Sequence, residues 1–164
     1  LENKPLKASS RQAHQFEKQL LKVCQDLSLM LLRDGEGATK VVEIKIKGGK
    51  THKEAEKIAR TIGTSLLVKT AFFGEDPNWG RLLGAAGRAG CSLDPSKVDL
   101  YYNQVCLVRH GVLADPSAEK KAKKVAQKPS YTITLNIHMG KGQAVLYSSD
   151  LGHNYVQLNS EYRT

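Results

Sequence analysis

The sequence has little that would suit a membrane protein or an oxidised, secreted one. No apolar run approaches the roughly 20 residues that span a bilayer, and the most apolar segment, 20–32, is interrupted by a lysine, a glutamine and an aspartate. The three cysteines are far apart and form no CxxC pair, which argues against a disulfide framework or a zinc site. The polar first residues lack the order of a signal peptide. We therefore expect a protein of the reducing cytoplasm.

An initial methionine is also missing, since the chain begins at Leu1, and we expect that the chain was cut, processed or truncated. Its 164 residues suit one domain and allow a real core. Hydrophobic residues make up 40% and charged residues 25% of the sequence, a balance typical of folded rather than disordered chains. We expect a single domain over residues 1–164.

Aromatic residues are scarce at 6%, whereas the formal net charge is +9. The excess charge is mostly lysine and lies in residues 1–22, 40–57 and 115–128. Proteins that read nucleic acids usually add arginines with interleaved aromatics, and the 115–128 run contains no aromatic residue. The pattern therefore favours a solvated surface, while a basic module that binds nucleic acid or an acidic partner remains the alternative.

The first half of the chain alternates between helical and strand-like periodicity. Apolar residues at helical spacing predict amphipathic helices over residues 9–34 and 51–63, each opened by a capping box. The capping residue of the first helix is Ser9. Strict alternation predicts a strand with one wet face over residues 41–47. The mostly apolar segment 65–73 is interpreted as a buried strand.

The second half adds further helices and strands without a regular βαβ order. Asp76 as N-cap and Pro77 at the first helical position predict a helix that ends at Gly90. The elements expected after it are a hairpin over residues 97–109, a lysine-rich helix that begins at 115–116, strands over 131–138 and 144–149, and a tail of mixed character over 151–162. This order indicates one α+β domain in which helices cover one face of a mixed sheet.

The loop after the first helix, residues 35–40, is rich in glycine and carries Glu36 between two glycines. It is not a phosphate-binding loop, because it lacks the GxxxxGK[ST] spacing and precedes a strand. Flanking glycines let a ligand approach the backbone closely, and the negative end of the preceding helix favours a cation. By itself the motif is more typical of a turn than of a site.

The segment 76–81 contains the only tryptophan, Trp79. A helix cap with a core aromatic is the favoured interpretation, and a helix N-terminus that faces an anion or a carbonyl is the alternative. We interpret the five histidines as structural or surface residues, because none has metal-ligand spacing. They are His14, His52, His110, His138 and His153. The serines and cysteines are in no nucleophile motif.

Several strings of the sequence occur together in an order that resembles a known family. They are DGEGATK at 34–40, LVKTAFFGEDPNWGR at 67–81, SDL at 149–151, YV at 155–156 and NSEYRT at 159–164. Together they resemble the C-terminal part of the β chain of the ArgJ family, the ornithine acetyltransferases of arginine biosynthesis, which can also act as N-acetylglutamate synthases. The resemblance runs from the first helix to the last residue.

The resemblance implies an N-acetyltransferase made as one chain, which cleaves itself before a threonine. That threonine becomes the N-terminal nucleophile of the β chain, because a free α-amine beside the hydroxyl can take its proton. It accepts acetyl from N-acetylornithine and passes it to glutamate, while donors of the α chain stabilise the oxyanion. The resemblance further implies a larger layered αββα sandwich, an α2β2 assembly, and no metal or organic cofactor, with acetyl-CoA as a possible donor substrate.

Carried over by position, the resemblance implies three substrate-binding residues, Glu36, Asn159 and Thr164. It implies no catalytic residue in this chain, because the nucleophile and the oxyanion donors correspond to positions upstream of Leu1. Internal threonines lack a free amine and are no substitutes. We therefore expect the chain alone to be inactive. Scaffold roles are expected for Asp76, Asn78, Trp79 and Arg81, which match a family signature.

Overall fold

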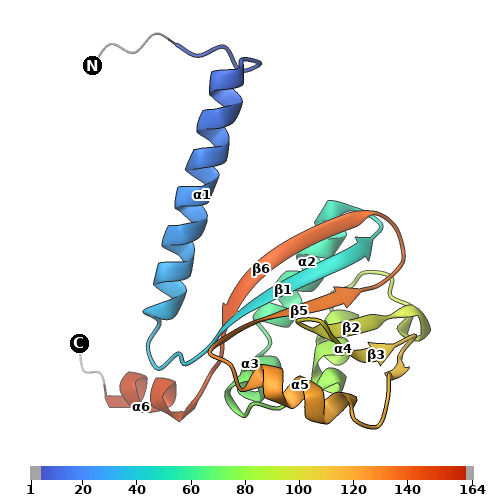
Figure 1. The fold of residues 1–164 in the computed structure, drawn as a ribbon. Helices are drawn as coiled ribbons and strands as arrows, with labels where there is room; N and C mark the ends of the chain where they lie inside the picture. The colour runs from blue at the N-terminus through green and yellow to red at the C-terminus, as the bar shows by residue number, and fades with distance from the viewer. Residues whose placement is uncertain (1–4, 162–164) are drawn as a thin grey trace. The chain divides into compact units, whose positions relative to one another are not determined.

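The computed structural model describes residues 5–161. The chain divides into two compact units, Leu1–Leu31 and Leu32–Thr164. Most of the first helix, α1 (Arg11–Arg33), lies in the first unit, and every other element lies in the second (Figure 1). The first unit is no second folded domain by itself, because a lone helix has no core to bury. The single domain expected over residues 1–164 stays a prediction.

Helix α1 begins one residue later than predicted, because the side chain of Ser10 rather than Ser9 accepts from the N–H of Ala13, at 3.1 Å. Its end at Arg33 agrees with the prediction. All of its residues are exposed or partly exposed. Its exposed large hydrophobic residues are Phe16, Leu20, Leu21, Val23, Leu27, Met30 and Leu31.

The second unit is built on a six-stranded mixed sheet of order β4-β3-β2-β5-β1-β6. Its strands are β1 (Val41–Gly49), β2 (Asp99–Tyr102), β3 (Val105–Arg109), β4 (Val112–Leu113), β5 (Ser130–Asn136) and β6 (Gly142–Ser149). Strands β1 and β5 are parallel, and the other neighbours are antiparallel. The strands predicted over residues 41–47, 131–138 and 144–149 and the hairpin over 97–109 are confirmed, with small shifts at their ends.

The register of the strands places their apolar side chains on one face of the sheet. Ile44 of β1 lies beside Ile133 of β5, which lies beside Tyr102 of β2, and all three are at most 1% exposed. On the other face the Thr132 hydroxyl donates to the Glu43 carboxylate at 2.7 Å. This alternation confirms the wet face predicted for β1.

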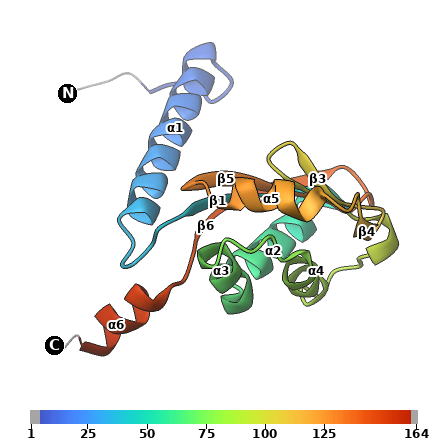
Figure 2. The same ribbon diagram turned by 60° about the horizontal axis from the view of Figure 1, so that its bottom comes forward.

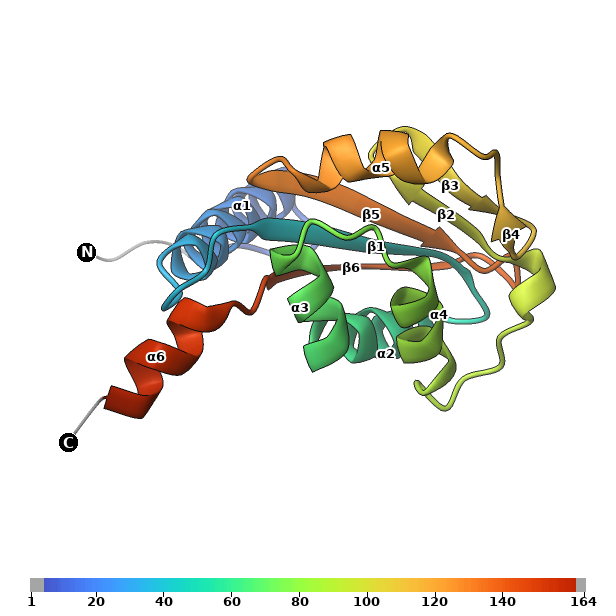
Figure 3. The ribbon, with the colours of Figure 1, turned by 90° about the horizontal axis from the view of Figure 1, so that it is seen from below.

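Helices cover the apolar face, as the α+β fold class predicts. Helices α2 (His52–Gly63), α3 (Leu66–Phe73) and α4 (Trp79–Gly87) lie together on one side of the sheet (Figure 2). Helix α5 (Ala118–Ala126) lies along β2 and β3 (Figure 3). Buried side chains from all four helices join those of the sheet in one core. Within residues 5–161, no helix is long and apolar enough to cross a membrane.

The strand predicted over residues 65–73 is wrong, because this segment forms helix α3. Leu66 and Leu67 are 67% and 64% exposed, whereas Val68, Ala71 and Phe72 are buried. Burial at spacings of three and four residues is the signature of a helix with one face on the core. A short apolar run carries too little periodicity to separate the two structures.

Other boundaries also differ from the predictions. Helix α5 begins at Ala118, after Ser117 as N-cap, rather than at 115–116. The cap of α4 is Asn78 rather than Asp76, since the Asn78 side chain accepts from the N–H of Arg81 at 3.0 Å. The helix ends at Gly87 and not at Gly90, which has a positive φ of 63°. The expected mixed tail contains a further helix, α6 (His153–Glu161).

Candidate functional site

Two of the three predicted substrate-binding residues meet at the surface of the second unit. Glu36 lies in the loop before β1, and Asn159 lies on α6. The Asn159 amide donates to the Glu36 carboxylate with an Nδ2–Oε2 distance of 2.9 Å across 123 positions of sequence. Both residues are exposed, so a ligand can reach the pair. The third predicted residue, Thr164, lies outside the described residues.

The amide group of Asn159 is oriented by two hydrogen bonds. Nδ2 donates to Glu36 and to the carbonyl of Tyr155, both at 2.9 Å. Because an amide nitrogen has two hydrogens, the side-chain oxygen of Asn159 is left as an acceptor. A carboxylate and an amide oxygen therefore lie side by side, an arrangement that suits an ammonium group.

A close backbone approach holds the glycine-rich loop against α6. Gly37 has a φ of 67°, and a Cβ on it would lie 2.6 Å from the backbone nitrogen of Tyr155. Only glycine combines this φ with this approach at no cost. The Ala38 N–H also donates to the Gly35 carbonyl at 3.0 Å. The loop is thus a tight turn, and the same turn presents Glu36 to α6.

Buried charges lie beneath this loop. The Lys40 side chain is only 6% exposed and pairs with Glu75 at 3.1 Å. Burial lowers the pKa of the Lys69 ammonium, which the Asp150 carboxylate opposes. Burial, followed by the Asp150 and Glu75 charges, raises the pKa of the Tyr131 hydroxyl, which has no hydrogen-bond partner among the described residues. Lys40, Lys69, Glu75 and Asp150 all lie in the motif strings. The periodicity of the sequence gave no sign that their side chains lie close together in the fold.

The signature segment 76–81 connects helices α3 and α4 and has no described contact with Glu36 or Asn159. The Arg81 guanidinium donates to the Leu67 carbonyl at 3.0 Å and to the Thr70 hydroxyl at 3.3 Å, which ties α4 to α3. Trp79 is partly buried against the core, as expected for a cap followed by a core aromatic. The scaffold roles of this segment stay predictions that these contacts support.

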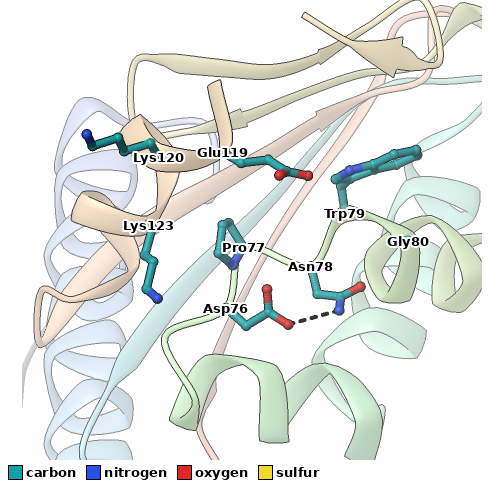
Figure 4. A pocket seen from close by; sticks show the side chains of 8 residues that line it. All are labelled: Asp76, Pro77, Asn78, Trp79, Gly80, Glu119, Lys120 and Lys123. Carbon is teal, nitrogen blue, oxygen red and sulfur yellow. Dashed lines mark hydrogen bonds between the residues drawn. The ribbon is translucent and has the colours of Figure 1, made fainter. Parts of the chain in front are cut away.

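A separate cleft of about 500 Å³ lies between segment 76–80 and helix α5. Glu119 reaches from α5 toward Trp79, and the Asn78 amide donates to Asp76 at 2.9 Å (Figure 4). Lys120 and Lys123 complete its wall. Neither Glu36 nor Asn159 lines this cleft. Because carboxylates and ammonium groups both line it, the cleft favours neither an anionic nor a cationic ligand.

Three histidines have a ring nitrogen within hydrogen-bond distance of a carbonyl or carboxylate oxygen. His14 and His52 lie against the backbone carbonyls of Ser10 and Gln143, and His138 lies 2.9 Å from the Asp99 carboxylate. Across residues 5–161, no group of three or more histidine, cysteine, aspartate or glutamate side chains could hold a metal ion.

The mixed sheet and the loop–helix pair define an α+β protein whose candidate site joins the segment before the first strand to the helix after the last. The sequence model of the ArgJ family matches residues 2–164. The chain therefore belongs to the ArgJ family, which confirms the resemblance in its motifs.

Similar proteins agree with this assignment. The arginine biosynthesis bifunctional protein ArgJ of Geobacter sulfurreducens is 40% identical over 162 residues, which cover 99% of this chain and 41% of that protein. The glutamate N-acetyltransferase of Methanocaldococcus jannaschii is 44% identical over 157 residues, covering 92% of this chain and 39% of that protein. The chain thus spans about two fifths of the length of these curated relatives.

A solved structure shares the fold. The crystal structure of the arginine biosynthesis bifunctional protein ArgJ from Bacillus halodurans matches with a TM-score of 0.91 at 32% identity. The match covers 98% of this chain and 75% of that one. The alternative of a basic module for nucleic acid or an acidic partner has no support in these matches.

Proposed function

We propose that this chain is part of a glutamate N-acetyltransferase, which transfers acetyl from N-acetylornithine to glutamate in arginine biosynthesis. The observation that carries the proposal is the contact between Glu36 and Asn159 at 2.9 Å, two residues for which the family resemblance implies substrate binding. The similar protein of Methanocaldococcus jannaschii bears the name of this activity.

In this proposal the chain binds and orients substrate while the acyl chemistry takes place elsewhere. The Glu36 carboxylate and the Asn159 amide oxygen accept hydrogen bonds from the ammonium group of ornithine. A charge-assisted hydrogen bond of this kind is stronger than a neutral one. The acetyl group is carried by an N-terminal threonine outside this chain, whose α-amine acts as the base, and Thr164 adds a third contact to the substrate.

The experiment compares acetyl transfer from N-acetylornithine to glutamate by the full-length protein and by the 164-residue chain alone. Transfer by the full-length protein with an inactive isolated chain is the expected result. An inactive full-length protein contradicts the proposed activity, and an active isolated chain contradicts the assignment of the nucleophile to another segment.

In the full-length protein, Glu36→Gln is expected to raise KM for N-acetylornithine about tenfold, equivalent to about 1.4 kcal/mol, because the amide cannot neutralise the ammonium. Self-cleavage should continue, since Glu36 takes no part in it. Steady-state kinetics and the ratio of cleaved to uncleaved chain are the measurements. Glu56→Gln on the exposed side of α2 is the matched control, and an unchanged KM in E36Q removes Glu36 from the site.

We propose that α1 docks on the α chain of the same precursor, within an α2β2 assembly. Its exposed apolar residues include Leu20 and Leu27, which lie on one helical stripe, and an exposed apolar stripe of this length marks an interaction surface. L20E/L27E should abolish co-purification with a tagged α chain. The control variant Q15E/Q25E adds the same charge to the opposite side of the helix and should still co-purify with the α chain. Equal recovery of both variants contradicts the docking.

We also propose that the reaction needs no metal or organic cofactor, with acetyl-CoA only as a second acetyl donor. Acetyl transfer between amines requires a nucleophile, a base and oxyanion donors, and full activity in the presence of a metal chelator is the expected result.

A cytoplasmic location is proposed because Cys24, Cys91 and Cys106 are all free thiols, as in reducing compartments.

A further inference from the structure

The carboxylate of Asp150 is buried beneath the loop that carries Glu36. Asp150 is 3% exposed and directly follows β6. Its Oδ1 accepts from the N–H groups of Thr39 at 2.8 Å and Lys40 at 2.9 Å, and its Oδ2 accepts from the Thr39 hydroxyl at 2.6 Å. Three hydrogen bonds from two consecutive residues fix the backbone only three positions after Glu36.

The same carboxylate stands at the start of the segment that leads to Asn159. The N–H of Leu151 donates to the Lys69 carbonyl of α3 at 3.1 Å. Gly152 packs against the ring of Phe73 with no room for a Cβ, and the rings of Phe73 and His153 meet edge to face at 5.6 Å. The path from Asp150 into α6 is thereby held on α3.

Helix α6 depends on these anchors because every one of its residues is exposed. An exposed helix of this length is marginal in water without tertiary contacts. Its contacts in the second unit include the approach of Gly37 to its first turn and the bond from Asn159 to Glu36. Asp150 therefore lies where the two halves of the candidate site are joined.

Burying a carboxylate is expensive unless it is fully hydrogen-bonded and compensated. Asp150 meets both conditions, with three donors and the nearby ammonium of Lys69. A neutral side chain could have filled this position at a lower desolvation cost. What the charge adds is a rigid geometry for the loop, since charge-assisted hydrogen bonds are short and directional.

We propose that Asp150 is a positioning residue, which sets the spacing between Glu36 and Asn159 and so determines affinity for the ammonium-bearing substrate. This inference rests on the proposed acetyltransferase function. Asp150 does not touch the substrate and acts only through the loop and α6. Loss of its charge lets the loop and the helix move apart, which weakens the binding of N-acetylornithine without altering the acyl-transfer step.

The test uses D150N in the full-length acetyltransferase. KM for N-acetylornithine is expected to rise about tenfold, because hydrogen bonds to a charged group are lost, while kcat is retained, as for a residue that acts on binding. If Asp150 acts through Glu36, the double variant E36Q/D150N has the same KM as E36Q, because the two effects are not additive. A purely structural role predicts instead that the two effects multiply.

Asp94→Asn is the matched control. Asp94 also accepts from a backbone N–H and a hydroxyl, those of Ser96, but in an exposed turn, so the kinetics of D94N should equal those of the unaltered enzyme.

If D150N does not fold, T39V tests the same role, because it removes only the 2.6 Å bond from the Thr39 hydroxyl to Asp150. We expect KM of T39V to rise about threefold. An active unaltered enzyme whose KM is unchanged in these variants, or whose KM effects multiply, overturns the role of Asp150. An inactive unaltered enzyme instead overturns the proposed function.

Discussion

Gly37 shows how a single residue decides whether the two halves of the site can meet. Its φ of 67° lies in the left-handed region, and its Cα lies against the backbone of Asn154 and Tyr155. Glycine permits both the dihedral angle and the approach. The neighbouring Glu36 can then reach Asn159, so the glycine is required by the geometry rather than by the flexibility of the loop.

Gly37→Ala should separate the loop from α6. The new Cβ would lie 2.6 Å from the Tyr155 nitrogen, so α6 must shift, and we expect KM for N-acetylornithine to rise at least as much as in E36Q. The control is Gly84→Ala, which lies on α4 with open space around it and should stabilise the fold by about 0.5–1 kcal/mol. Kinetics and urea denaturation measure the two effects. Unchanged kinetics in G37A would mean that the loop–helix contact is dispensable.

At the scale of single residues, the sequence nominates candidate site residues but does not show which residues they contact. Glu36 and Asn159 were nominated through their motifs, and the structure brings them together. Asp150 stood in a motif string without a role, because a buried hydrogen-bonded aspartate has the same local pattern as an exposed one. Its contacts with Thr39 and Lys40 span 110 positions or more, a separation that no local pattern can report.

At the scale of elements, clear amphipathic periods were predicted well and short apolar runs were not. Helix α2 follows its prediction closely, with Thr51 as cap and Ala55, Ile58, Ala59 and Ile62 buried. Helix α3 was predicted as a strand because eight mostly apolar residues are too few to separate the helical period from the strand period. Packing against α4 and β6 decides between them.

Removing the cap of α2 should weaken the whole second unit. Thr51 accepts from the N–H of Glu54 at 3.1 Å, and α2 packs on β1 and β6. Thr51→Ala is expected to cost about 1 kcal/mol and to lower Tm by about 3–6 °C, measured by circular dichroism. Thr51→Ser keeps the acceptor and should behave like the unaltered protein. A Tm that falls equally in both variants would point to the lost methyl group instead.

At the scale of the whole molecule, the sheet brings Asp99 of β2 into contact with two later loops. Its Oδ1 accepts from the N–H of His110, and its Oδ2 lies beside Nε2 of His138, both at 2.9 Å. Burial works to raise the pKa of Asp99, but the bonds from His110 and His138 prevail and the pKa is lowered. A lowered pKa means that the folded state favours the carboxylate.

The stability that Asp99 contributes should therefore depend on pH on the acid side. It is fully present above the unfolded pKa of about 3.9 and is lost as the pH falls through the lower, folded pKa. Asp99→Asn should be less stable than the unaltered protein at pH 7, and this difference should shrink between about pH 4 and pH 2. Urea midpoints across this range measure it, with Asp26→Asn on α1 as control. A difference that stays constant with pH contradicts the role of the charge.

By itself, the sequence determined the α+β class, the wet face of β1, the capped helix α2 and the family, because each depends on neighbouring residues or on strings that can be read in order. Only the tertiary structure decided that segment 66–73 is a helix, that α6 closes on the loop, and that Asp150 joins them. These features depend on contacts between residues far apart in the chain, whose energies become favourable only when the sheet and its helices are assembled.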